Sequence, residues 1–282
     1  MLRNSNELQG CAIRALDGLI GHVTDCYFDD QRWVLRYLIV ETGSWLASRK
    51  VLISPFAIGE PDWSARVLPV SITMEQVRNS PDIDTDQPVS RQHELQYLRH
   101  FDYPYYWLGD GFWGSAAFPG AMLTGLGYSG SGAEYLVAQA EAGRADPESH
   151  LRSSKALLRY HIDATDGGMG QLKGLLFEER SWAIRYLIAD TSNWWLGHQV
   201  LLAPQWIENI SWPDATIRVT VTRQAVQDAP LYDAAVPLSR EHESALFAQH
   251  RRVGYWAEEI RLENPQFQIA RSAPPESIRR DT

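Results

Sequence analysis

Basic charge and cysteine are both scarce in this chain. It has 26 Lys and Arg against 35 Asp and Glu, a formal net charge of −9, and no run of basic residues. Binding along a phosphate backbone depends on neutralisation by Lys and Arg, so we expect no nucleic-acid partner. The two cysteines, Cys11 and Cys26, both lie in the first half of the chain and lack the spacing of a zinc-ligand pair.

Long hydrophobic runs and common catalytic motifs are also missing. The first residues, Met1–Glu7, have no apolar core, so we expect no signal peptide. Residues 112–133 carry no charge, but Pro119 and several glycines interrupt them, so we expect no membrane span, while peripheral association with a membrane stays open. There is no G-x-S-x-G motif and no phosphate loop. We expect neither a cofactor nor a metal.

What the chain has instead is one apolar stretch that it contains twice. Trp33–Val40 and Trp182–Ala189 are each eight residues of apolar and aromatic side chains, broken by a single Arg. Aromatic and β-branched residues in such a run favour a strand with both faces covered. The stretch predicts a β fold that is present twice, with both Trp side chains in the cores.

The two copies align without a gap at a constant offset of 149 residues, so that position 17 matches position 166. The alignment extends over about a hundred residues, which indicates a duplicated domain, since solenoid repeats are a few tens of residues long. Tyr160 and Leu175 stand where the first copy has its cysteines. Because one copy folds without them, we expect free thiols in a reducing compartment and hence a cytoplasmic protein.

Each repeat is predicted to hold about five short strands joined by turn residues, a pattern of small barrels and sandwiches. In the first repeat the strands after Asp17-Gly18 are Ile20–Phe28, the central stretch, Val51–Ile53 and Arg66–Ile72. We expect two repeats at 1–107 and 151–256, a glycine-rich linker with a short helix at 134–142 over residues 108–150, and a tail at 257–282 that is disordered from 271 onwards.

Helix signals follow the strands. Thr73 and Gln76 match a capping box. Ser90 begins a second helix, and an aromatic segment that contains Tyr105 and Trp107 follows it.

The most polar motif of the repeat is Ser-Arg-x-His-Glu. It occurs in both copies as Ser90, Arg91, His93, Glu94 and Ser239, Arg240, His242, Glu243. Catalysis would require His and Glu to converge, but adjacent helix positions diverge by about 100°. The helix-cap interpretation, with Ser as the cap and Glu in the first turn, is therefore favoured over a catalytic or metal site.

Arg36 and Arg185 interrupt the central stretches. One interpretation is a contact with an anion or a partner; the other is a charge at the barrel rim, paired with a carboxylate. The aromatic side chains Tyr105, Trp107 and Trp256 are further candidates for contact. Acidic residues in the turns, such as Asp29, could bind a divalent cation, but stabilisation of the turn backbone is sufficient to explain their presence.

The glycine spacing at residues 109–114 and 125–130 matches the G-x-G-x-x-G fingerprint of dinucleotide-binding proteins. That fingerprint requires a strand before it and a helix after it. Neither pattern has this context, so flexibility is the favoured interpretation.

Taken together, the pattern Ile-x-Ala-x-Asp-Gly-x-x-Gly, followed by two acidic residues and Trp-x-x-Arg-Tyr-Leu-Ile, resembles the PRC-barrel domain family. The resemblance covers roughly residues 10–80 and 159–229. This family includes the cytoplasmic domain of the photosynthetic reaction-centre H subunit and the C-terminal domain of the ribosome maturation factor. It implies small β-barrels used for protein contacts rather than catalysis.

The fold we expect is mainly β with short helices: two small PRC-type β-barrels, each followed by a helical segment, packed as a pseudo-two-fold pair. The post-barrel helices and aromatic segments are predicted to lie in or near the interface, because exposed aromatic patches usually mark contacts. The leading function is a non-catalytic module for protein interaction or assembly, with an unknown protein partner. The alternatives are an H-subunit-like factor in light-driven electron transfer, and an enzyme or metal-binding protein.

Overall fold

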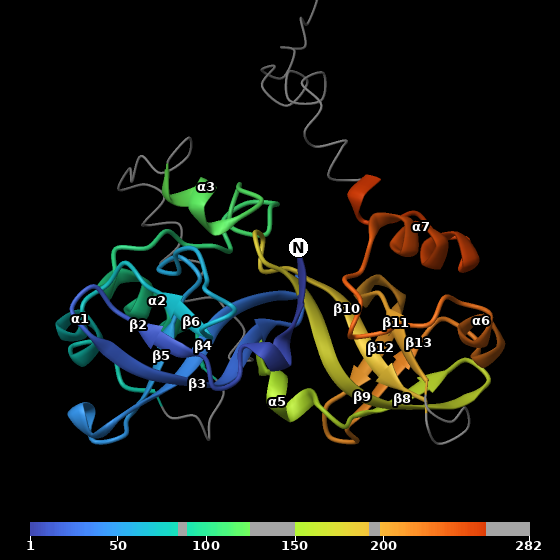
Figure 1. Ribbon diagram of the computed structural model, residues 1–282, viewed down its shortest axis with the longest axis horizontal. Helices are drawn as coiled ribbons and strands as arrows, with labels where there is room; N and C mark the ends of the chain where they lie inside the picture. The colour runs from blue at the N-terminus through green and yellow to red at the C-terminus, as the bar shows by residue number, and fades with distance from the viewer. Residues whose placement is uncertain (84–88, 125–149, 192–197, 258–282) are drawn as a thin grey trace, which may run out of the picture.

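The computed structural model describes residues 1–83, 89–124, 150–191 and 198–257. These residues form a mainly β protein with two sheets, one from each repeat, and short helices around them (Figure 1). Three expectations lie outside the described residues: the helix at 134–142, the second glycine pattern and the disordered end of the tail.

The two sheets share the same order over five equivalent strands, and the second has an additional strand, β12, beside β13. In the first, the strand order is β5-β4-β3-β2-β6, and in the second it is β11-β10-β9-β8-β13-β12. Neighbouring strands are antiparallel except β2 with β6 and β8 with β13. Among the described residues, neither order is closed by a pair between its two end strands. The strands are β2 (Ala12–Arg14), β3 (Leu19–Asp29), β4 (Val34–Thr42), β5 (Lys50–Ile53), β6 (Val67–Pro69), β8 (His161–Ala164), β9 (Gly167–Glu178), β10 (Ile184–Asp190), β11 (Gln199–Leu202), β12 (Ile207–Ser211) and β13 (Thr216–Val219).

The central strands are shorter at their start than expected. Trp33 and Trp182 precede β4 and β10 and have φ values of 55° and 60°, in the left-handed region, so they belong to the turns. Their rings stack on Phe28 and Phe177, with centroids 5.3 Å apart in both cases. Trp182 is buried, whereas Trp33 is half-buried, so the expectation of two core Trp side chains is wrong for Trp33. Beyond them, both strands are almost wholly buried, as predicted.

The predicted helix caps are confirmed. Thr73 and Gln76 form a capping box at the start of α1 (Met74–Arg78). The side chains of Ser90 and Ser239 cap α2 (Arg91–His100) and α7 (Arg240–Gln249) by accepting from the backbone N–H three residues on. The other helices of the described residues are α3 (Pro119–Leu123), α5 (Ser154–Leu157), α6 (Arg223–Gln227) and the 3-10 turns η1 (Ser5–Glu7), η2 (Ser44–Leu46) and η3 (Pro204–Trp206). None of the helices in the described parts of the chain is long and apolar enough to cross a bilayer.

The repeats exchange short strands. β1 (Leu2–Asn4) pairs with the end of β9 in the second sheet, and β7 (Leu151–Ser153) pairs with the end of β3 in the first. The two strands are 149 positions apart, and so are their partners. Arg3 and Arg152 make equivalent ion pairs across the interface, with Glu179 at 2.6 Å and with Asp30 at 2.9 Å. Each sheet is therefore completed by a strand from the other repeat.

A local two-fold relation runs through the middle of this interface. Val34 and Ala183, which are equivalent positions, form an isolated antiparallel bridge. On either side, Leu35 N donates to Trp182 O at 2.9 Å and Ile184 N donates to Trp33 O at 2.7 Å. Because each bond maps onto the other under the same offset, these contacts obey a two-fold symmetry.

The interface is built differently from the expectation, which placed the post-barrel helices in it. Instead, α2 is linked to β4 through Tyr37 and Glu94, and α7 to β10 through Tyr186 and Glu243. The aromatic side chains that were expected at the interface pack mainly within their own repeat. The cross-repeat contacts include the exchanged strands, the central bridge between Val34 and Ala183, and residues of the segment 112–118. The two cysteines are free, as predicted, and both are buried.

Candidate functional site

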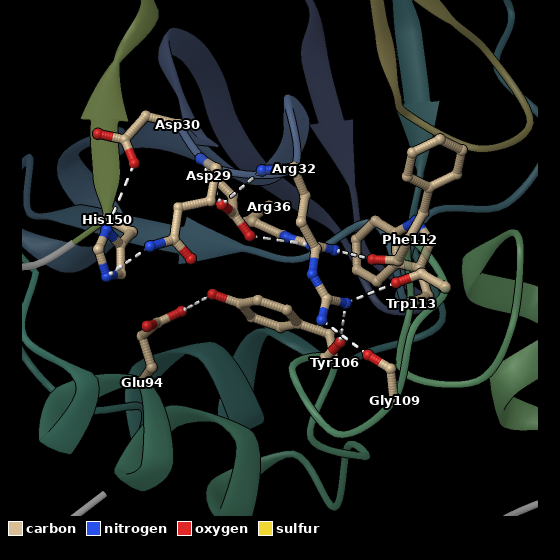
Figure 2. A network of polar contacts seen from close by, with 12 residues as sticks. Asp29, Asp30, Arg32, Arg36, Glu94, Tyr106, Gly109, Phe112, Trp113 and His150 are labelled. Atoms are coloured by element: carbon tan, nitrogen blue, oxygen red, sulfur yellow. Dashed lines mark hydrogen bonds and ion pairs between the residues drawn. The ribbon is translucent and has the colours of Figure 1, made fainter. Parts of the chain in front are cut away.

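One buried arginine lies at the centre of the network in Figure 2. Arg36 projects from β4 and its side chain is fully buried. Its Nη2 lies 3.1 Å from Asp29 Oδ2, and its Nη1 donates to the Phe112 carbonyl at 2.5 Å. The Asp29 carboxylate also accepts from the backbone N–H groups of Gln31 and Arg32. The turn between β3 and β4 thus fixes the anion that the buried arginine requires.

Aromatic rings cover the guanidinium group of Arg36. Its Cζ atom lies 3.9 Å from the centroid of the Tyr106 ring and 4.9 Å from that of Trp113. Burial lowers the pKa of Arg36 from its ordinary value, while Tyr106 and Asp29 oppose the shift. The rings and the carboxylate together offset part of the cost of burying the charge.

A second arginine holds the main chain that covers this site. Arg32 Nη1 donates to the Gly111 carbonyl at 2.5 Å, and Nη2 donates to the Gly109 carbonyl at 2.7 Å. With the bond from Arg36 to Phe112, two guanidinium groups bind three carbonyls of one short segment (Figure 2). The glycine pattern at 109–114 is therefore an ordered cover over the sheet rather than a flexible one.

A buried carboxylate connects the helix to the sheet. Glu94, 2% exposed, accepts from the hydroxyls of Tyr106 and Tyr37, the latter at 3.2 Å. Arg91 Nη1 lies 2.9 Å from Glu94 Oε2. Burial raises the pKa of Glu94 above its ordinary value, although Arg91 and the two hydroxyls act in the opposite direction. These bonds join α2, β4 and the aromatic segment into one unit.

The second repeat contains the same arginine site. Arg185, 6% exposed, lies 2.5 Å from Glu178 Oε2 and 4.1 Å from the ring centroid of Tyr255. Ser181 Oγ donates to the same Glu178 oxygen at 2.6 Å. Burial raises the pKa of Glu178, but the Ser181 hydroxyl and Arg185 outweigh it and the net shift is downward.

The buried carboxylate is duplicated as well. Glu243 accepts from Tyr186 and Tyr255, both at 2.8 Å, and lies 3.1 Å from Arg240. Every partner of Glu94 thus has its counterpart 149 positions later. The network is a property of the repeat and not of one copy.

Two consecutive residues, Phe112 and Trp113, join the two arginine sites. Trp113 lies against Arg36, and the Phe112 ring lies against Arg185, with Cζ 5.1 Å from the ring centroid. Trp113 is fully buried, and its Nε1 donates to the Ser181 carbonyl of the other repeat at 2.7 Å. Each arginine therefore contacts one aromatic residue of its own repeat and one from this dipeptide.

The structure settles the interpretation of Arg36 and Arg185 in part. Pairing with a carboxylate is confirmed, but the rim position is wrong, because both side chains are buried under aromatic rings. The predicted divergence of His93 and Glu94 is also confirmed, since Glu94 is buried while His93 is half-buried. Burial lowers the pKa of His93, and Asp82 opposes that shift.

Most of the remaining candidate residues lie around the network. Trp107 lies under Arg91, with Cζ 4.2 Å from the ring centroid, and Trp256 lies under Arg240 at 4.5 Å. Tyr105 is buried and stacks on Trp107. The Nε2 atoms of both motif histidines, His93 and His242, are buried and have no hydrogen-bond partner within the described residues.

Sequence reasoning missed several members of this network. The carboxylates that pair with the buried arginines were interpreted only as turn residues, and the tyrosines of the network were not considered as site residues. A usable signal existed for the carboxylates and the tyrosines, because acidic residues and tyrosines recur at these positions at the constant offset, whereas Arg32 is replaced by Ser181. The cover residues have no such signal. The missed residues are Asp29, Arg32, Tyr37, Tyr106, Phe112, Trp113, Glu178, Tyr186 and Tyr255.

The chemistry available to the network is limited by burial. Arg36, Tyr37, Glu94 and Tyr106 are each at most 2% exposed and are bonded to one another or to main chain. A substrate cannot reach them without displacing the cover. Among the residues that the structure describes, no group of three or more His, Cys, Asp or Glu is placed to hold a metal ion.

Comparisons with known proteins add no relative. No family model matches this chain, and no curated protein matches it in sequence.

Proposed function

We propose that this chain is a cytoplasmic, non-catalytic tandem PRC-barrel protein that serves as a module for protein interaction or assembly. The observation that carries the proposal is the duplicated network around Arg36 and Arg185. The arginines Arg36 and Arg185 and the carboxylates Glu94 and Glu243 are buried and bonded to other groups of the network, so they serve to fix the helix and aromatic segment on each sheet. The most polar motif of the sequence is thereby used for architecture.

The sheet topology supports the barrel interpretation. In each repeat a meander of four strands precedes a later strand, β6 or β13, that returns beside the first one, and in the second repeat β12 comes before the returning strand. β3 is long and has register shifts at Val23/Asp25 and Tyr27/Phe28, and such bulges increase the twist that closes small barrels.

The exchanged strands support an assembly role. β1 and β7 each add to the end of a strand in the other repeat, which is the β-addition mode that many interaction domains use. The fold therefore already recognises an extended segment by main-chain bonds within its own chain.

Affinity purification of the full chain from its native cells tests this proposal. We expect a protein partner at a fixed stoichiometry that stays bound when the ionic strength is raised. Purification of the chain alone, together with a turnover activity that His93→Ala or His242→Ala abolishes, would overturn it.

A further inference from the structure

The second repeat carries a polar hollow that is separate from the buried network. It has a volume of about 500 Å³, a size typical of sites for small ligands. Its lining comes from β8, the adjacent strands β9 and β13, and the first residue of α6, which lie together in Figure 1. The lining residues used below are His161, Asp163, Gly168, Thr216 and Arg223.

The first repeat has apolar side chains at four of the five equivalent positions, and Arg14 at the fifth, where the second repeat has Asp163. Gly168 corresponds to Leu19 and Arg223 to Met74. The Met74 sulfur lies so close to Gly18 that a Cβ atom there would be 2.5 Å from it, so this end of the first repeat is filled. At Gly167, which is equivalent to Gly18, a Cβ atom would lie 3.6 Å from Arg223 Nη1, and a Cβ atom on Gly168 would meet only Asp163 Oδ1, at 3.8 Å, so the second repeat has more open space here.

Two further polar residues of the hollow replace apolar ones in the same comparison. His161 and Thr216 stand where the first repeat has Ala12 and Val67. They are direct neighbours in the parallel pair of β8 and β13, so they present an imidazole and a hydroxyl side by side. The second copy has thus gained both space and hydrogen-bonding groups at one place.

The charges at the hollow have opposite signs. Arg223 is anchored at the start of α6, where its backbone N–H donates to Asp166 Oδ1 at 2.8 Å. Its Nη1 lies 3.6 Å from the Cβ position of Gly167, next to the open space at Gly168. Asp163 borders that space from β8. A guanidinium group binds a carboxylate by two parallel bonds, and a carboxylate binds an ammonium group.

We propose that this hollow is a binding site for a small zwitterion, an amino acid whose carboxylate binds Arg223 and whose ammonium group binds Asp163. One positive and one negative side chain leave the charged lining close to neutral, which disfavours a polyanion such as a nucleotide. His161 and Thr216 supply further hydrogen bonds, and the missing side chain at Gly168 supplies the room. This inference is independent of the proposed assembly role.

Titrations of the ¹⁵N-labelled full chain followed by NMR test the site. The probes are glycine, β-alanine and γ-aminobutyrate, which differ in the distance between their charges, with acetate and methylammonium as single-charge controls. We expect saturable shifts of the Gly167 and Gly168 amides with at least one amino acid. Its affinity should exceed that of either control about tenfold, because both charge-assisted contacts form at once.

The first repeat provides matched variants. Gly168→Leu and Arg223→Met install the residues of the first repeat and should abolish the shifts, while Asp163→Asn should reduce the affinity about tenfold. Leu19→Gly alters the equivalent place in the first repeat and should leave binding unchanged. The proposal is overturned if no probe gives saturable shifts, if acetate binds as tightly as every amino acid, or if binding persists in folded Gly168→Leu.

Discussion

The indole N–H of Trp113 is expected to stabilise the pairing of the two repeats. In Trp113→Phe the ring stays apolar, but the bond to the Ser181 carbonyl is lost in a fully buried setting. A buried carbonyl left without a donor costs about 1–3 kcal/mol. The smaller ring removes further contacts worth on the order of 1 kcal/mol. We therefore expect a loss of about 3 kcal/mol in the free energy of unfolding.

Trp45→Phe is the matched control. The Trp45 indole also donates to a carbonyl, that of Ile20, and at the same distance of 2.7 Å. Trp45 is only half-buried, so water can replace the lost donor and the cost should be about 1 kcal/mol or less. Both bonds are equal in length, and only their burial and their position relative to the interface differ.

Thermal unfolding followed by circular dichroism distinguishes the two variants. For a domain of about 150–250 residues, 1 kcal/mol shifts Tm by roughly 2–4 °C. Trp113→Phe should therefore lower Tm by about 6–12 °C, and Trp45→Phe by no more than about 4 °C. Equal shifts in the two variants would refute the assignment of Trp113 as the residue that joins the repeats.

Three further outcomes are expected. The native pKa of Glu178 is lowered, so its contribution to stability is present above the unfolded pKa of about 4.3 and is lost as pH falls through the native pKa. The native pKa of Glu94 is raised, so its contribution is fully present below about 4.3 and is lost as pH rises through the native pKa. Urea unfolding at several pH values measures the difference in free energy of unfolding between wild type and each variant. This difference should narrow on acidification for Glu178→Gln and widen for Glu94→Gln. If the two differences changed with pH in the same direction, the assignment of the two shifts would be contradicted. Trp182→Ala should cost about 3–5 kcal/mol and Trp33→Ala clearly less, because only Trp182 is buried, and equal costs in calorimetry would argue against that difference. Small-angle scattering should show one compact envelope, since strands are exchanged between the repeats, and two separated lobes would contradict it.

The elements that follow local rules could be predicted from the sequence. The Thr73 capping box and the Ser90 cap depend on residues three positions apart, so the sequence contains all the information that they require. The central strand was recognisable because its apolar run needs both faces covered. Its start was misplaced, since Trp33 has the composition of a strand residue but a left-handed φ.

The candidate site was only half predictable, because its members meet through the tertiary fold. The carboxylates beside the buried arginines look like ordinary turn residues, and only the long β3–β4 pairing brings Asp29 back to Arg36. Phe112 lies in a glycine-rich segment without periodicity, so no local pattern indicates that it contacts the second repeat. The constant offset would have revealed the duplicated residues, but not this one.

The exchange of β1 and β7 within one chain affects which amino-acid substitutions the two copies can accept. Two separate copies would dissociate on dilution, but two fused copies meet at an effective concentration on the order of millimolar. A symmetric dimer of identical chains must also accept every substitution twice. Fusion removes that constraint, and the two copies have since diverged: Arg32 holds the cover where the second copy has Ser181, and Leu19 stands where the second copy has Gly168. One half of the pair is thereby free to acquire new chemistry while the other half preserves the shared architecture.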